Sequence, residues 1–165
     1  MKKFLAMLMA VMMVLSLVTV PVMAETPAAN DPRLSTAPKT GTAAAPADAA
    51  NLNEALNVAG GTLTFTSEGD HPWIVDGDAA KSTNVNVANS TSTVSTTVTA
   101  AAGDILQFDF MSFGEGAGDY VWDGLHLTVD GTEVMKWSRV ETWTTYAVEL
   151  TAGEHTVAWS YQKDG

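Results

Sequence analysis

The sequence predicts an all-β protein: an antiparallel jelly-roll β-sandwich, preceded by a signal peptide and a disordered linker. Two observations predict this fold. From residue 60 onward, apolar residues recur at every second position, which is the period of a strand with one buried face. Short turn signals, and no long helical patterns, separate these segments, so a Rossmann fold or an α/β barrel is excluded. The chain divides into residues 1–24, 25–50 and 51–165.

Residues 1–24 have the pattern of a secretory signal. Two lysines give a positive start, and an almost wholly apolar run follows from Phe4 to Val18. Val22 and Ala24 put small residues at the −3 and −1 positions of a cleavage site. The alternative is an uncleaved anchor, but the run is shorter than the ~20 residues that a spanning helix needs. We therefore predict a secreted or cell-surface bacterial protein, with no membrane contact after cleavage.

Composition excludes several classes of function. The chain has 165 residues, with 8 basic and 19 acidic side chains, a net charge of −11 and no cysteine. The acid excess argues against nucleic-acid partners, which need a basic surface. Without cysteine there can be no disulfides, no thiolate metal sites and no cysteine nucleophile.

The middle segment, residues 25–50, is predicted to be a linker. It holds four prolines among many Ala, Thr and Gly residues and has no apolar period. Just after it, Asn51 is suited to cap one helical turn in which Leu52 and Leu56 share a face. A short strand is the alternative for this piece.

Seven segments of the third region have the alternation of strands. They are residues 63–65, 73–75, 92–99, 106–110, 125–129, 146–150 and 155–161. Asp130–Gly131 is a two-residue hairpin signal that would place Val129 opposite Thr132 and Leu127 opposite Val134. A four-residue loop between the last two strands would place Tyr146 opposite Trp159, with the apolar residues of both strands on the same side of the pair.

Several motifs in the last third of the chain resemble those of a known family. They are Trp-Asp-Gly-Leu at 122–125, Val-Asp-Gly at 129–131, and the run from Leu150 to Gly165. Residues 60–165 resemble the jelly-roll modules of bacterial exported proteins that are related to MAM-like, cleaved-adhesin and choice-of-anchor domains. The resemblance implies a non-catalytic role in adhesion, carbohydrate binding or spacing. It also implies a further strand after the Lys163–Gly165 turn, so the sandwich is expected to lack its last strand.

The five tryptophans provide the candidate ligand-binding residues. Trp122, Trp137 and Trp143 lie near predicted loops or strand ends, where exposed aromatic faces can stack on sugar rings. The expected partner is a glycan or a host or cell-surface protein. The alternative is that all five tryptophans pack in the core, as Trp73 and Trp159 are expected to do.

An oxygen-rich cluster provides the candidate metal site. Glu68, Asp70, Asp76 and Asp78 surround a strand end, and Ca²⁺ takes six to eight oxygen ligands. The alternative is a turn that uses Asp and Gly for its backbone geometry. A second acidic set lies among the glycines of residues 114–124, where calcium binding and a flexible loop are the two interpretations.

Catalytic motifs are absent from the sequence. There is no Gly-x-Ser-x-Gly elbow, and the three histidines lie in separate segments without a paired spacing. We therefore expect no enzyme activity, and predict a non-catalytic extracellular module for adhesion or carbohydrate binding. The alternatives are a structural spacer domain without a ligand and an accessory module of a secreted hydrolase.

Overall fold

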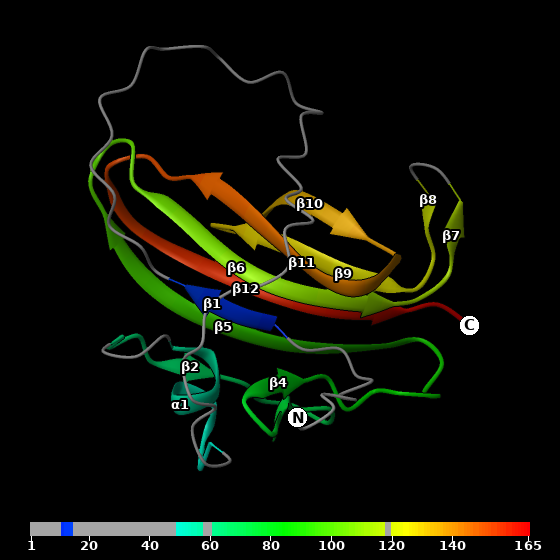
Figure 1. The fold of residues 1–165 in the computed structure, drawn as a ribbon. Coiled ribbons are helices and arrows are strands. Elements are labelled where there is room, and N and C mark those ends of the chain that lie inside the picture. The colour runs from blue at the N-terminus through cyan, green and yellow to red at the C-terminus, as the bar shows by residue number, and fades with distance from the viewer. Residues whose placement is uncertain (1–10, 15–48, 58–60, 118–119) are drawn as a thin grey trace.

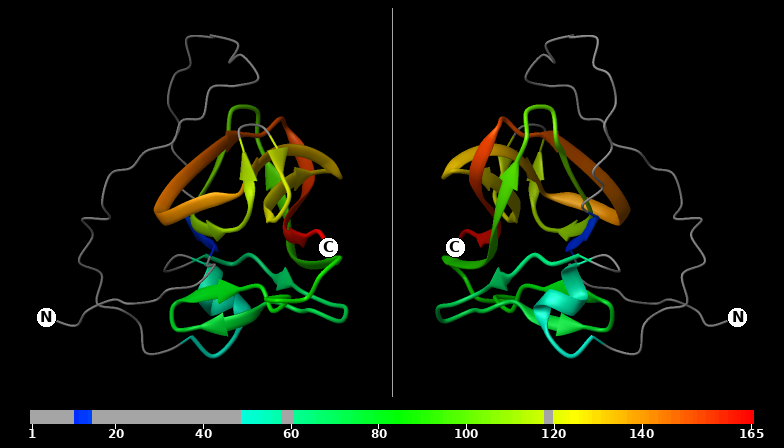
Figure 2. Two further views of the ribbon diagram at one scale, coloured as in Figure 1. Left: turned by 90° about the vertical axis from the view of Figure 1, so that its right-hand side faces the viewer. Right: turned by 90° about the vertical axis from the view of Figure 1, so that its left-hand side faces the viewer.

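The computed structural model describes residues 11–14, 49–57, 61–117 and 120–165, and it confirms the all-β fold class (Figure 1). Two five-stranded antiparallel sheets form a sandwich, which Figure 2 shows from its two ends. The first sheet has the order β11 (Arg139–Glu149), β6 (Ile105–Phe113), β1 (Val11–Val14), β4 (Ala79–Lys81) and β3 (Ile74–Asp76). The second has the order β10 (Thr132–Trp137), β9 (Gly124–Val129), β12 (Gly153–Lys163), β5 (Ser90–Ala100) and β2 (Phe65–Thr66).

Two smaller elements complete the described part of the chain. The hairpin of β7 (Gly116–Ala117) and β8 (Tyr120–Val121) projects from one end of the sandwich (Figure 1). The single turn α1 (Leu52–Leu56) confirms the helical alternative for this segment. Asn51 caps it, because its side-chain oxygen accepts a hydrogen bond from the Glu54 backbone N–H at 3.1 Å.

The core between the sheets is rich in aromatic rings. Phe108 of β6 packs edge-on against Trp159 of β12, with ring centroids 5.4 Å apart. Trp137 packs edge-on against Tyr146 at 5.0 Å. Trp73 and Trp159 are both buried, which confirms the expectation that they belong to the core.

The β9–β10 hairpin has the predicted turn and the predicted pairing of Val129 with Thr132, but not the predicted register beyond Glu133. Asp130 and Gly131 both have left-handed φ values, +52° and +76°, as a tight two-residue hairpin turn requires. A bulge between Glu133 and Met135 then places Met135 opposite Leu127. The expected pairing of Leu127 with Val134 was wrong, because the bulge inserts one residue that the alternation alone does not reveal.

The last two long strands do not pair with each other. Strand β11 lies beside β6, with Tyr146 opposite Phe108, whereas β12 lies between β9 and β5, with Trp159 opposite Leu127 and Val94. The expected pairing of Tyr146 with Trp159 was therefore wrong. Two strands carry the same alternating apolar residues whether they pair within one sheet or face each other across a core, so alternation does not distinguish the two arrangements. Strand β12 has a neighbour on each side, so no gap lies next to it.

Strand β1 comes from the predicted signal segment. It runs antiparallel to β6 and to β4 and lies between them, with Val11 opposite both Phe110 and Ala80. The rest of residues 1–24, the predicted cleavage site and nearly all of the predicted linker lie outside the described residues. Within the described ranges, no helix is long and apolar enough to cross a membrane.

Candidate functional site

Two strongly exposed aromatic residues lie together at the projecting hairpin. Tyr120 of β8 is 74% exposed, and Trp122, just after β8, is 52% exposed. Trp122 lies at a bend that directly follows β8, two residues after Tyr120. We call Tyr120 and Trp122 the aromatic tip.

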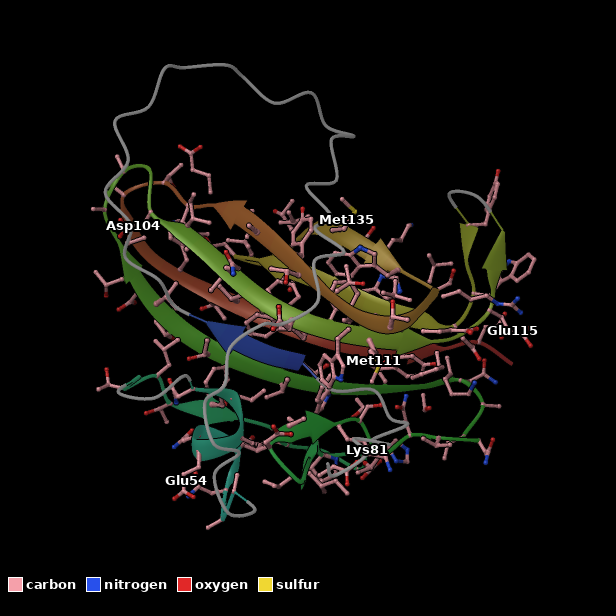
Figure 3. The ribbon with its side chains drawn as sticks, in the orientation of Figure 1. Glu54, Lys81, Asp104, Met111, Glu115 and Met135 are labelled. Carbon is pink, nitrogen blue, oxygen red and sulfur yellow. The ribbon has the colours of Figure 1, made fainter. Side chains whose placement is uncertain are left out.

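The base of this hairpin is fixed by the backbone. The Glu115 carbonyl accepts hydrogen bonds from the Trp122 and Asp123 N–H groups, at 2.9 and 3.0 Å, and Figure 3 labels Glu115 at this end of the molecule. A Cβ on Gly114 would lie 2.1 Å from the Asp123 carbonyl oxygen. A Cβ on Gly124 would lie only 2.5 Å from a Val121 methyl group. Gly114 and Gly124 therefore permit close packing of the backbone at the hairpin base.

A partly buried ion pair holds the end of β12 against the same base. The Lys163 ammonium contacts Asp123 Oδ2, and the Asp164 N–H donates to Asp123 Oδ1 at 3.0 Å. The Tyr161 hydroxyl donates to the Phe113 carbonyl. Burial, reinforced by the charge of Asp123, raises the pKa of Tyr161 to about 12. Trp122 thus stands beside a residue that is anchored to another strand.

The three predicted ligand-binding tryptophans lie in different places. Trp122 belongs to the aromatic tip, and Trp143 is 39% exposed on β11. Trp137 is only 7% exposed and packs against Phe110 with centroids 4.4 Å apart, so it cannot present its face to a ligand. Sequence analysis missed Tyr120, although its two-residue spacing from Trp122 was a signal that could have found it.

The predicted metal residues do not form a cluster. Asp76 and Asp78 flank Gly77 in the turn between β3 and β4, where Gly77 has a φ of +68°. Glu68 and Asp70 are exposed in the preceding loop. Within the described ranges, no three His, Cys, Asp or Glu side chains are placed to hold a metal ion. This geometry agrees with the turn interpretation of the Asp-Gly-Asp motif and gives no support for calcium there.

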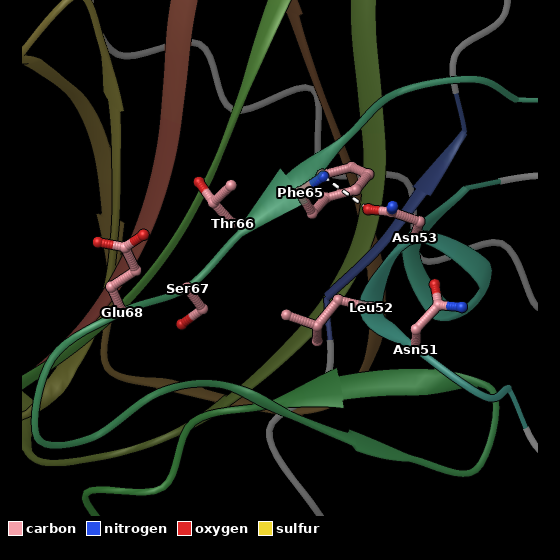
Figure 4. A pocket seen from close by; sticks show the side chains of 7 residues that line it. All are labelled: Asn51, Leu52, Asn53, Phe65, Thr66, Ser67 and Glu68. Atoms are coloured by element: carbon pink, nitrogen blue, oxygen red, sulfur yellow. Dashed lines mark hydrogen bonds between the residues drawn. The ribbon is translucent and has the colours of Figure 1, made fainter.

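An open groove lies beside α1 and β2 (Figure 4). It has a volume of about 460 Å³ and is lined by Asn51, Leu52, Asn53, Phe65, Thr66, Ser67 and Glu68. Asn53 Oδ1 accepts from the Phe65 N–H at 2.7 Å, and Ser67 Oγ accepts from the Trp73 N–H at 2.7 Å. Asn53 and Ser67 are therefore committed to hydrogen bonds with the backbone.

Two histidine–carboxylate pairs have the distance of a catalytic dyad, His126 with Glu133 and His155 with Asp130, each at 2.7 Å. His155 Nδ1 lies 2.7 Å from Asp130 Oδ2, and His155 Nε2 lies 3.0 Å from the Thr151 carbonyl oxygen. The hydrogen bond with Asp130 raises the pKa of His155 and lowers the pKa of Asp130. The Thr151 hydroxyl also lies 3.3 Å from His155 Nε2, so both polar groups of Thr151 lie against the same ring nitrogen. The pair of His155 and Asp130 links the β9–β10 turn to the start of β12.

Comparisons with known proteins find no match for this chain. No protein-family model, no curated protein sequence and no solved structure matches it. The class that fold and site define is an antiparallel β-sandwich that presents two aromatic rings on a braced hairpin. A function for the chain has to be argued from these features.

Proposed function

We propose that this chain is an exported, non-catalytic binding module whose aromatic tip stacks on the sugar rings of a glycan. The observation that carries the proposal is the joint exposure of Tyr120 and Trp122 on a hairpin with a fixed base. Large aromatic side chains left in water at one place on a surface mark an interaction site more often than isolated apolar residues do.

The chemistry of the tip suits a sugar. The electron-rich face of an aromatic ring attracts the slightly positive C–H groups on one side of a pyranose, and stacking removes both from water. Hydroxyl groups at the rim of the sugar need polar partners. Glu115 and Arg139 are both exposed near the hairpin base, where Arg139 Nε donates to the Gly114 carbonyl at 3.4 Å. The fixed base also lowers the ordering entropy that binding would otherwise have to overcome.

Two further considerations support a non-catalytic role. Among the described residues, Asn53 and Ser67 of the groove beside α1 are hydrogen-bonded to the backbone, and His155 is held between Asp130 and Thr151 within the turns that join the strands. The resemblance of residues 60–165 to exported jelly-roll modules points to adhesion or carbohydrate binding as well. The spacer and the hydrolase-accessory interpretations are the alternatives that an experiment must separate.

The test is glycan-array binding by the exported protein and three variants. Trp122→Ala and Tyr120→Ala each remove one ring of the tip, and Trp143→Ala removes an exposed ring on β11. A central aromatic anchor contributes about 2 kcal/mol, so Trp122→Ala should weaken binding roughly 30-fold. Tyr120→Ala should weaken it less, and Trp143→Ala should leave it unchanged.

Each other outcome contradicts the proposal in a distinct way. Binding of no glycan by the folded wild-type protein favours the spacer. Turnover of a glycan or peptide panel favours a hydrolase. Loss of binding in Trp143→Ala with full binding in Trp122→Ala places the site on β11.

A further inference from the structure

The outward side of the second sheet carries an uncharged surface that is rich in hydroxyl groups. Strands β5, β12 and β9 lie side by side in this sheet (Figure 1), and the side chains that alternate with their buried residues point away from the core. We call the outward positions of residues 91–97, 156–162 and 126–128 the hydroxyl face. Most of these positions hold Ser or Thr, and none holds Asp, Glu, Lys or Arg.

One row of the hydroxyl face crosses three strands in register. Thr93 of β5 lies opposite Ser160 of β12, and Ser160 in turn lies opposite His126 of β9. Opposite residues on one face of an antiparallel pair have Cβ atoms about 5 Å apart. The Thr93 and Ser160 hydroxyl groups are hydrogen-bonded to each other at 2.8 Å. Because a hydroxyl group both donates and accepts, this pair still has donor and acceptor capacity for a ligand after its mutual bond.

His126 is the buried member of this row. Its side chain is only 9% exposed, and its Nδ1 lies 2.7 Å from Glu133 Oε2 on β10. An ionised carboxylate only accepts, so Nδ1 carries the hydrogen of this bond and Nε2 of the neutral ring is an acceptor. Within the described part of the chain, Nε2 has no hydrogen-bond partner. Since Glu133 holds the ring, a ligand that reaches Nε2 meets an acceptor whose position is already fixed.

The hydroxyl face is neutral although the neighbouring strands are charged. Threonine is common on solvated sheets because β-branched side chains favour strands, but this preference does not exclude charges. Strand β10 exposes Glu133 and Lys136, and β11 exposes Arg139, Glu141 and Glu149. The hydroxyl face is therefore a neutral area on a chain whose net charge is −11.

The chemistry of the hydroxyl face selects among classes of partner. A protein partner needs large apolar or aromatic side chains at the centre of its interface, whereas Ala158 is the one apolar side chain among the outward positions of this face. An anionic polymer needs cations, and the face has none. A ligand with many hydroxyl groups, each of which donates and accepts, matches the face in both charge and hydrogen bonding.

We propose that the hydroxyl face binds an uncharged, linear polysaccharide and that Thr93, Ser160 and His126 form hydrogen bonds with one of its sugar units. This inference rests on the proposed sugar binding at the aromatic tip and extends it from a stacked ring to a longer chain. Thr93 and Ser160 offer donors and acceptors to the sugar hydroxyl groups, and His126 Nε2 accepts from one of them.

The hydroxyl face begins close to the aromatic tip. Its end row contains Gln162, which lies opposite Gly124 in register, and Gly124 follows Trp122 by two residues. From residue 162 to residue 156 the face extends about 20 Å along β12, at about 3.3 Å per residue. A polysaccharide with one ring at the tip can therefore continue along the outward side of the sheet.

The experiment measures how the affinity of the exported protein depends on the length of a neutral oligosaccharide. The probes are the monosaccharides and hexasaccharides of the xylan, cellulose, mannan and chitin series, with hexagalacturonate as the anionic probe, in isothermal titration calorimetry. A longer chain reaches the hydroxyl face as well as the tip. In at least one series the hexasaccharide should therefore bind roughly 10-fold more tightly than its monosaccharide, and hexagalacturonate should not bind.

Five variants test the hydroxyl face against matched controls. Thr93→Val keeps the branched shape but removes the hydroxyl, and His126→Phe keeps a ring without nitrogen atoms; each should weaken hexasaccharide binding roughly 5-fold. The control Thr99→Val makes the same change on β5 beyond the end of the face and should bind as the wild type does. Ala158→Arg places a long side chain in the middle of the face and should abolish the gain with chain length. Ala152→Arg, in the exposed loop between β11 and β12, should preserve it.

The outcomes separate this inference from the proposed function. Equal affinity for monosaccharide and hexasaccharide, lost in Trp122→Ala, leaves sugar binding at the tip and overturns the role of the hydroxyl face. A gain with chain length that survives Ala158→Arg, or an equal loss in Thr93→Val and Thr99→Val, also overturns it. Hexasaccharide binding that Ala158→Arg abolishes and Trp122→Ala leaves intact supports the face and contradicts the tip. Binding of no neutral probe by the folded protein contradicts both.

Discussion

The ion pair between Asp123 and Lys163 should contribute strongly to stability, and the change Lys163→Met tests this. Methionine keeps the length and apolar stem of the side chain, but it leaves the Asp123 carboxylate without its cation. The two side chains are only 11% and 19% exposed. At an effective dielectric constant of about 20 and a separation of about 3 Å, the attraction is roughly 5 kcal/mol. Residual contact with water reduces the expected loss to about 3 kcal/mol, within the range for a broken buried pair.

This loss is large enough to measure by thermal unfolding. A domain of about 115 residues has an unfolding entropy near 0.24 kcal/mol/K, so the Tm should fall by about 12 °C. The matched control is Lys136→Met, which breaks an exposed pair with Glu133 at 3.4 Å and should cost less than about 1 kcal/mol. Adding Asp123→Asn to Lys163→Met should restore part of the stability, because no uncompensated charge remains. If Lys163→Met costs no more than Lys136→Met, the pair does not brace the hairpin.

Three further outcomes follow from the same structure. The hydrogen bond with Asp130 raises the pKa of His155 in the folded protein. The stabilisation from this pair should therefore be complete below the ordinary pKa of 6.5 and should disappear as the pH rises through the pKa of the folded protein. Tm values of the wild-type protein and of His155→Gln between pH 5 and 9 measure this. The pKa of the Tyr161 phenol is raised to about 12, so this group should ionise last among the tyrosines in an absorbance titration. The free energy of unfolding should fall between pH 10 and 12, because the phenol ionises in the unfolded chain before it ionises in the folded one. Tyr161→Phe should remove this fall in stability. Gly124→Ala should destabilise the domain by about 2 kcal/mol in urea unfolding, because its Cβ would lie 2.3 Å from the Trp137 carbonyl oxygen.

The fold class could be predicted because long strands such as β5 and β12 bury every second residue over most of their length. Residues 106, 108 and 110 point inward along β6, and the alternation in the sequence records this directly. Strand β4 could not be found in the same way, since Ala79 and Ala80 are both buried and show no alternation. For a related reason, the sequence could not predict which strands pair with each other. The apolar row of Tyr146 fits equally well beside Trp159 or across the core from it.

The candidate site was predictable only in part, and one bulge explains a large share of the error. If Val134 paired with Leu127, Trp137 would point to solvent, because it lies an odd number of residues away. The extra residue in β10 reverses the alternation, so Met135 and Trp137 take the inward positions. A one-residue bulge thus moved a candidate ligand-binding ring into the core. The Gly-rich hairpin carries Tyr120, and its position depends on close backbone contacts. Such contacts produce no periodic pattern in the sequence, so the exposure of Tyr120 could not be predicted from one.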